Sequence, residues 1–181
     1  TEIGNYSYIT GSGRSRRVHT WGYACMLLNR DMPHIVLDAK QNNLFQRFSN
    51  LPDLFGTNQK LSLEGDFDSY FTLYAPAEYK RDTLYLFTPD VMAKLIDHGK
   101  SYDMEVIDNV LYLYSATAIK LESEESLRTI VEIIDVIGDE IKDQNQNYRD
   151  EHSAVVDAVT TQDFIAPQGK RLKKKLNIIS I

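Results

Sequence analysis

The sequence contains a single cysteine, Cys25, among its 181 residues. One cysteine cannot form an internal disulfide and cannot hold zinc unaided, so nothing in the sequence requires an oxidising compartment. Cys25 lies in the apolar run 23–28, where a thiol usually acts as a small buried hydrophobic group. We therefore expect Cys25 to be structural rather than reactive.

Long hydrophobic runs are also missing. No stretch approaches the roughly 20 apolar residues that a membrane-spanning helix needs. The chain begins TEIGNYSYIT, without the charged start and apolar segment of a signal peptide. Because these first residues already have the pattern of a strand, we expect the sequence to be a piece of a longer protein.

Basic residues are fewer than acidic ones: the sequence has 20 Lys and Arg residues and 26 Asp and Glu residues, which gives a net charge of −6. Phosphate contacts need a basic surface or at least a basic face. We therefore expect no nucleic-acid partner. We also expect no cofactor, because the sequence contains no phosphate-binding loop, no nucleophile elbow and no metalloprotease motif.

What the sequence does contain is a sizeable hydrophobic fraction, 43%, with eleven tyrosines and seven phenylalanines. Aromatic residues favour strands with cross-strand pairs. The first forty residues have strand patterns, and the glycines of GSG at 11–13 suit a hairpin connection. A phosphate-binding loop is the alternative, but such a loop leads into a helix rather than a strand. We predict a hairpin.

Two helices are predicted, over about 89–98 and 124–142. The first begins with the cap Thr88 and with Pro89 at its first position, and Gly99 ends it. The second begins after Ser123 and keeps apolar residues at helical spacing for four turns. A short irregular helix is expected over 40–50, a loop over 75–83, and a second hairpin over 102–114 that turns at Asp108 and Asn109.

These patterns predict an α+β fold, in which a mostly antiparallel sheet packs against the two helices. We expect residues 1–165 to form a single domain, and residues 166–181 to form a basic C-terminal tail.

The most suggestive polar pattern is LSLEGDFDSYFTLY at 61–74, where Glu64, Asp66 and Asp68 alternate. On an unbroken strand these carboxylates would share one face and could hold calcium or magnesium. However, the calcium-loop signature is missing, and Gly65 suggests a bend that would spoil the alignment. A structural role for the three carboxylates is the favoured interpretation, and a metal site is the alternative.

The tail is the second candidate site. It contains five basic residues beside an apolar terminus: Lys170, Arg171, Lys173, Lys174 and Lys175. A solvated terminus and contact with an anionic membrane surface are both consistent with this pattern. The final NIISI could instead pair as an edge strand.

Residues 61–115 resemble a bacterial membrane-anchored family of unknown function, number three-one-three-seven among the domains of unknown function. The resemblance rests on an aromatic strand, a Thr-Pro helix start, the helix itself and a return ending in tyrosines: Phe67, Tyr70, Phe71, Thr88, Pro89, Met92, Leu95, Ile96, Leu111, Tyr112 and Tyr114. It implies two membrane helices followed by a soluble domain at the cytoplasmic face, with no defined catalytic residues. The segment APAEYKRDT departs from the family pattern by its length.

The leading functional hypothesis is a non-enzymatic interaction or scaffold domain of a membrane-anchored protein, with an unknown protein or an anionic lipid surface as its partner. The alternative is a metal-dependent hydrolase or metal-binding domain that uses Glu64, Asp66 and Asp68, with His34 as a further candidate ligand. The sequence does not determine the oligomeric state.

Overall fold

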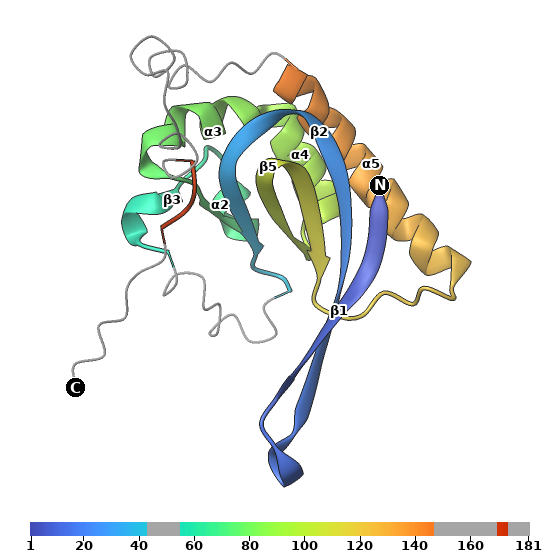
Figure 1. Ribbon diagram of the computed structural model, residues 1–181. Helices are drawn as coiled ribbons and strands as arrows, with labels where there is room; N and C mark the ends of the chain where they lie inside the picture. Colours follow the sequence, from blue (N-terminus) through green and yellow to red (C-terminus); the bar gives the residue numbers. More distant parts are fainter. Residues whose placement is uncertain (43–54, 147–169, 174–181) are drawn as a thin grey trace, which may run out of the picture.

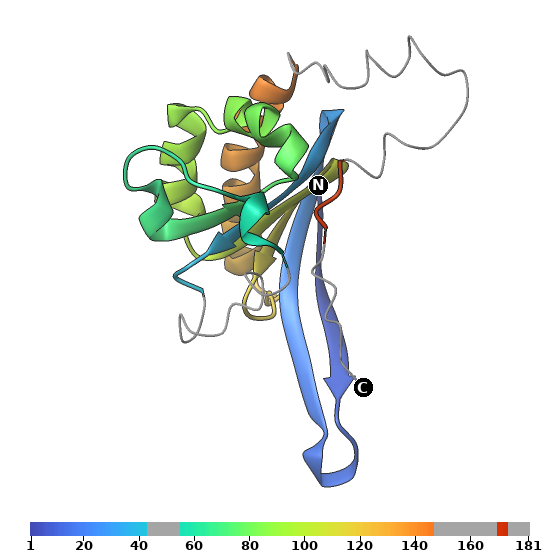
Figure 2. The ribbon, with the colours of Figure 1, turned by 90° about the vertical axis from the view of Figure 1, so that its left-hand side faces the viewer.

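The computed structural model describes residues 1–42, 55–146 and 170–173. They form a five-stranded antiparallel sheet with helices packed on one face, as Figures 1 and 2 show. The predicted α+β class is therefore confirmed. The predicted helix over 40–50, most of the tail and the boundary near 165 lie outside the described residues.

Strand β2 (Arg17–Ala39) is the centre of the sheet. It pairs with β1 (Glu2–Thr10) and β4 (Phe71–Tyr74), and on its other side with β5 (Tyr102–Ser115). The short β3 (Lys60–Leu61) pairs with β4. All of these pairs are antiparallel, as predicted.

The pairing of β2 with β5 shifts register twice, between Leu27 and Met32 and between Met32 and Ile35. At this point both strands bend, and Figure 1 shows β2 as an arch over β5. Asp108 lies at the bend of β5 with a φ of 53°, in the left-handed region that aspartate tolerates. The predicted hairpin over 102–114 is wrong, because both halves of β5 pair with β2 and not with each other.

The predicted N-terminal hairpin is confirmed. Residues 2–10 pair with residues 17–25, and Gly11 and Gly13 have φ angles of 74° and 54°. Beyond the body of the domain this hairpin continues as a two-stranded projection, visible in Figures 1 and 2. We call residues 5–21 the arm.

Helix α5 (Glu124–Gln146) provides most of the cover for the sheet and runs four residues beyond the predicted end. Its isoleucines at 130, 134, 137 and 141 are buried in the main core. At Gly138 the helix lies so close to β2 that an added Cβ would be 1.8 Å from Sδ of Met26. A larger residue would therefore require the Met26 side chain to move aside or the helix to shift.

Helix α4 (Pro89–Lys94) continues into a π-helical turn, Leu95–Gly99, which confirms the predicted helix and its end. Oγ1 of Thr88 accepts a hydrogen bond from the Val91 amide at 3.4 Å, as a cap residue does. The loop predicted over 75–83 is partly wrong, because α3 (Lys80–Leu86) forms there. Within residues 1–42, 55–146 and 170–173, none of the helices has the length and apolar character needed to cross a bilayer.

The stretch 61–74 is bent, as Gly65 suggested, and is not one unbroken strand. Gly65 turns the chain with a φ of 72°, and α2 (Phe67–Tyr70) is a single helical turn before β4. Phe67 and Phe71 stack with ring centroids 5.0 Å apart and are buried in the core. These two rings are therefore part of the main core.

The face of the sheet opposite the helices, which we call the outer face, has a different character. Because side chains alternate along a strand, β2 places Ile35 and Leu37 in the main core and Val36 on the outer face. Val36 packs there in a second apolar cluster with Phe55, Tyr74 and Leu172. Figure 2 shows the segment 170–173 on this side of the sheet, away from the helices.

Candidate functional site

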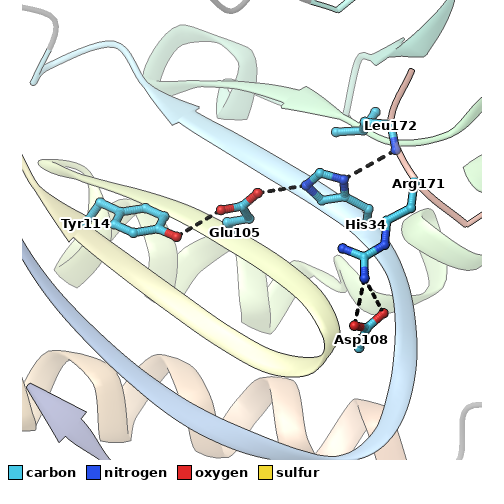
Figure 3. Close-up of polar contacts among 6 residues, drawn as sticks. All are labelled: His34, Glu105, Asp108, Tyr114, Arg171 and Leu172. Carbon is cyan, nitrogen blue, oxygen red and sulfur yellow. Dashed lines mark hydrogen bonds and ion pairs between the residues drawn. The ribbon is translucent and has the colours of Figure 1, made fainter. Parts of the chain in front are cut away.

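The outer face holds a chain of polar side chains at the bend of the sheet, shown in Figure 3. His34 follows the bend of β2, and its Nε2 lies 2.7 Å from Oε1 of Glu105 on β5. The Tyr114 hydroxyl donates to the other oxygen of Glu105 at 2.9 Å. The bend of β5 brings Glu105 and Tyr114 together from its two halves.

The tautomer of the neutral His34 ring follows from its second neighbour. The backbone amide of Leu172 lies 3.3 Å from Nδ1 of His34, and an amide N–H can only donate. Nδ1 therefore accepts, and in the neutral ring the proton is on Nε2, which donates to Glu105. Both ring nitrogens are thus occupied by hydrogen bonds.

The segment 170–173 is held chiefly through its backbone. The His34 amide donates to the Lys170 carbonyl at 2.8 Å. At the other end, the side-chain amide of Gln59 donates to the Lys173 carbonyl and accepts from the Lys173 amide, both at 2.7 Å. Gln59 is buried, with 4% of its surface exposed. The Gln59 side chain thus gives Lys173 one donor and one acceptor, the same pair of hydrogen bonds that a residue of a neighbouring strand would give an extended peptide.

Between these two points, the side chain of Leu172 fills the second apolar cluster and is 8% exposed. Phe55 and Tyr74 contribute rings whose centroids lie 5.5 Å apart, and the ring of His34 stands edge-on to Phe55. Burying a leucine side chain contributes about 1.5–3 kcal/mol. Leu172 is therefore the apolar anchor of the segment.

Arg171 points the other way and binds both carboxylate oxygens of Asp108 at 2.9 and 2.7 Å. Both side chains are substantially exposed, so the pair adds selectivity more than stability. Beside the segment lies a pocket of about 220 Å³, lined among others by Asn58, Glu78 and Lys173. We call the contacts from His34, Gln59, Asp108 and the apolar cluster the docking site.

The pKa values of the polar chain follow from its surroundings. Burial by itself raises the pKa of Glu105, but the hydrogen bonds from His34 and Tyr114 outweigh it and leave that pKa below its usual range. Burial, followed by the charge of Glu105, raises the pKa of Tyr114. Glu105 is therefore ionised and Tyr114 is protonated near neutral pH.

Two more carboxylates lie on the outer face. Burial raises the pKa of Asp103 to about 6. The Ala39 amide, which donates a hydrogen bond to Asp103 at 2.8 Å, lowers this pKa, and the charge of nearby Asp38 raises it further. Burial, followed by Asp38, raises the pKa of Tyr74 to about 12. These groups extend the polar chain toward the far end of β2.

With residues 170–173 in place, both ring nitrogens of His34 and both carboxylate oxygens of Glu105 have hydrogen-bond partners. A general base needs a free lone pair, whereas both nitrogens of His34 are already engaged. Tyr114 is kept protonated by its burial and by the charge of Glu105. What the docking site offers is a set of backbone partners, an apolar pocket and one carboxylate.

The structure separates the carboxylates that the sequence pattern put on one face. Glu64 and Asp66 are exposed. Asp68, in α2, accepts hydrogen bonds from the Ser62 hydroxyl and from the Leu63 amide at 3.2 Å, which fixes the turn before the helix. The described part of the chain contains no group of three or more His, Cys, Asp or Glu residues placed to hold a metal ion. The metal site at Glu64, Asp66 and Asp68 therefore stays a prediction, because the described residues do not hold these carboxylates together as a ligand set.

Of the basic residues predicted to contact a membrane, Lys174 and Lys175 lie outside the described residues. Arg171 binds Asp108. The ammonium group of Lys173 lies 3.8 Å from Glu78, with both side chains largely exposed. Cys25, expected in the core, is only half-buried, on β2.

Sequence reasoning missed Gln59 and Asp108 as partners of the tail, and Glu105 as the partner of His34. Their only sequence signal is the alternation of Asp103 and Glu105 with apolar residues, which marks a strand with one polar face. Pairing that face with a segment some sixty residues further along the chain requires the fold.

Comparisons with protein-family models, with curated proteins and with solved structures find no match to this chain.

Proposed function

We propose that this chain is a non-enzymatic interaction domain whose docking site binds an extended basic peptide. The observation that carries the proposal is the way in which the docking site holds residues 170–173. Two backbone carbonyls and two backbone amides of the segment are bound, and one leucine fills an apolar pocket. Peptide recognition by strand addition combines these same two elements.

The contacts define the peptide that fits. Asp108 selects arginine at the first side-chain position, and the apolar cluster selects leucine at the next. The residue after the leucine is bound through its backbone by Gln59, so its side chain is free to vary. The preferred ligand is therefore an extended Arg-Leu pair within a basic segment.

In this interpretation the chain's own segment is a resident competitor. A segment tethered to its own binding site reaches an effective concentration of about millimolar. A partner peptide must therefore displace residues 170–173, and the free site is exposed only when they leave. Interaction and self-occupation are alternative states of one surface.

The test uses a variant of the full chain in which the resident segment cannot dock, Arg171→Ala with Leu172→Asp. Fluorescence anisotropy then measures binding of a labelled peptide with the sequence of residues 169–175. We expect binding to this variant, and binding at least about tenfold weaker to the unaltered chain because its own segment competes.

Two controls define the site. The same peptide with its leucine changed to aspartate should not bind, and Gln59→Leu in the vacated variant should weaken binding of the original peptide. Far-UV circular dichroism confirms that each protein is folded. Absence of peptide binding to the folded, vacated variant at millimolar peptide would refute the proposal.

The second part of the proposal is that the domain acts at a membrane. It is supported by the family resemblance of residues 61–115 and by the basic composition of residues 170–175. Each basic residue near an anionic surface contributes about 1 kcal/mol. Flotation of the full chain with vesicles containing phosphatidylserine, at low and at high salt, tests the tail. Binding that is insensitive to salt or to removal of the tail's charges would count against it.

A further inference from the structure

Strand β1 is an edge strand, because it ends the strand order β1-β2-β4-β3 and pairs only with β2. The direction of its backbone groups can be worked out from β2. The Gly22 amide donates to the Thr117 carbonyl, on the β5 side of β2, so Gly22 points its backbone groups away from its β1 partner, Asn5. Its neighbour Trp21 points the other way, toward Tyr6.

Alternation along the strand then assigns every residue of β1. The even-numbered residues bond to β2, and the odd-numbered ones point their N–H and C=O groups outward: Ile3, Asn5, Ser7 and Ile9. No described residue supplies a partner to these outward amides. The outward edge is therefore a ready template for another strand.

The sequence of this edge lacks the usual protection. Natural edges are blocked by charge, by proline or by a bulge, but residues 3–9 contain no charged residue and no proline, and their register with β2 is unbroken. In addition, the arm exposes 54% of Tyr6 and 52% of Ile9. A two-stranded ribbon alone is marginally stable in water, so the arm gains most from a third strand.

We propose that β1 pairs antiparallel with β1 of a second copy of this chain, around a two-fold axis at Tyr6. The outward groups of Asn5 and Ser7 then bond to those of Ser7 and Asn5 in the partner. In this register Ile3 faces Ile9, Gly4 faces Tyr8 and Tyr6 faces Tyr6. The edge is self-complementary, which an isologous two-fold interface requires.

Charge favours the second copy as the occupant. Arg14, Arg16 and Arg17 lie at the tip of the arm, and Glu2 lies at its base. Antiparallel pairing separates the two arginine tips and places each tip toward the other copy's Glu2. The bodies, which carry the net negative charge of the chain, lie at opposite ends of the four-stranded ribbon.

This interface is independent of the docking site, which lies on the outer face around the bend. Failure of one proposal therefore leaves the other standing.

Sedimentation of the full chain from micromolar to millimolar concentration tests the pairing. We expect a concentration-dependent species with twice the mass of one chain. Ser7→Pro removes an outward amide and no internal backbone bond, so it should abolish that species. Ser7→Ala loses the hydroxyl contact with Thr20 but keeps the amide, and it should associate like the unaltered chain.

A cross-link tests the register even if the proline variant fails to fold. Directly opposed, non-hydrogen-bonded residues have Cα atoms about 4.5 Å apart, within the range of a disulfide. In a Cys25→Ser background, Tyr6→Cys should therefore form a covalent dimer on mild oxidation, whereas Tyr8→Cys, which faces Gly4, should not. A monomer throughout the concentration range, a Ser7→Pro variant that still dimerises, or equal cross-linking by both cysteines would each overturn the proposal.

Discussion

Replacement of Asp103 by asparagine should stabilise the protein at neutral pH and leave it nearly unchanged in acid. Asp103 lies on β5, where burial raises the pKa of its carboxyl from the ordinary 3.8 to about 6. One pKa unit corresponds to about 1.4 kcal/mol, so this rise corresponds to about 3 kcal/mol. Asparagine has no charge to bury, and its Oδ1 can still accept from the Ala39 amide.

The pH range follows from the direction of the shift. Below about pH 4 the carboxyl is protonated in both the folded and the unfolded chain, so it contributes no difference. Between pH 4 and 6 the unfolded chain releases the proton first, and the free energy of unfolding falls as pH rises. Above pH 6 the folded chain carries the full cost of a buried charge beside Asp38.

Urea unfolding of both proteins at pH 4, 5, 6 and 7 measures this difference, and subtracting the two curves removes the other titrating groups. We expect the asparagine variant to gain about 2–3 kcal/mol at pH 7 and little at pH 4. Asp135→Asn on the exposed side of α5 is the matched control and should show no such trend. A gain that is equal at pH 4 and pH 7, or a loss at pH 7, would refute the reasoning.

Three further experiments test the packing of α5, the docking site and the reactivity of Cys25. Gly138→Ala places a Cβ against Met26 and should cost about 1–3 kcal/mol of unfolding free energy by urea titration, with Met26→Ala in the same chain restoring part of it. Gln59→Leu removes both backbone bonds to Lys173, and the Lys173 amide should exchange with deuterium faster by about tenfold or more. An unchanged exchange rate would mean that the segment does not depend on Gln59. The half-buried Cys25 thiol, whose pKa burial and then Glu2 raise, should react with a thiol reagent at pH 8 several times more slowly than free cysteine.

Local chemistry in the sequence predicts the elements that depend on neighbouring residues. Thr88 and Pro89 start a helix, Gly99 ends it, and the GSG turn joins two strands, all as expected. These features need only capping and turn geometry. The isoleucine spacing of α5 similarly predicts a helix with one buried face, whatever surface that face packs against.

The main failures involve distant partners. Asp108 has the left-handed conformation of a turn residue, but β2 pairs with both halves of β5 and turns the expected hairpin into one bent strand. In 61–74 the bend that Gly65 suggested is present, but the single turn of α2 that follows it was not predicted. The docking site joins residues from β2, β5 and the C-terminal segment, and the sequence places no two of these side by side.

The central position of β2 has a consequence for the order in which the strands pair during synthesis. Gly22 finds its partner at Ser115, and Leu37 finds its partner at Met104, so the middle of the sheet cannot close until most of the chain has left the ribosome. The β1–β2 hairpin is local and complete within the first 25 residues, and local contacts form first. At a synthesis rate of about 5–20 residues per second, the arm with its uncovered strand edge precedes the rest of the sheet by seconds. During that interval, neighbouring nascent chains on one messenger could meet edge to edge before either has folded.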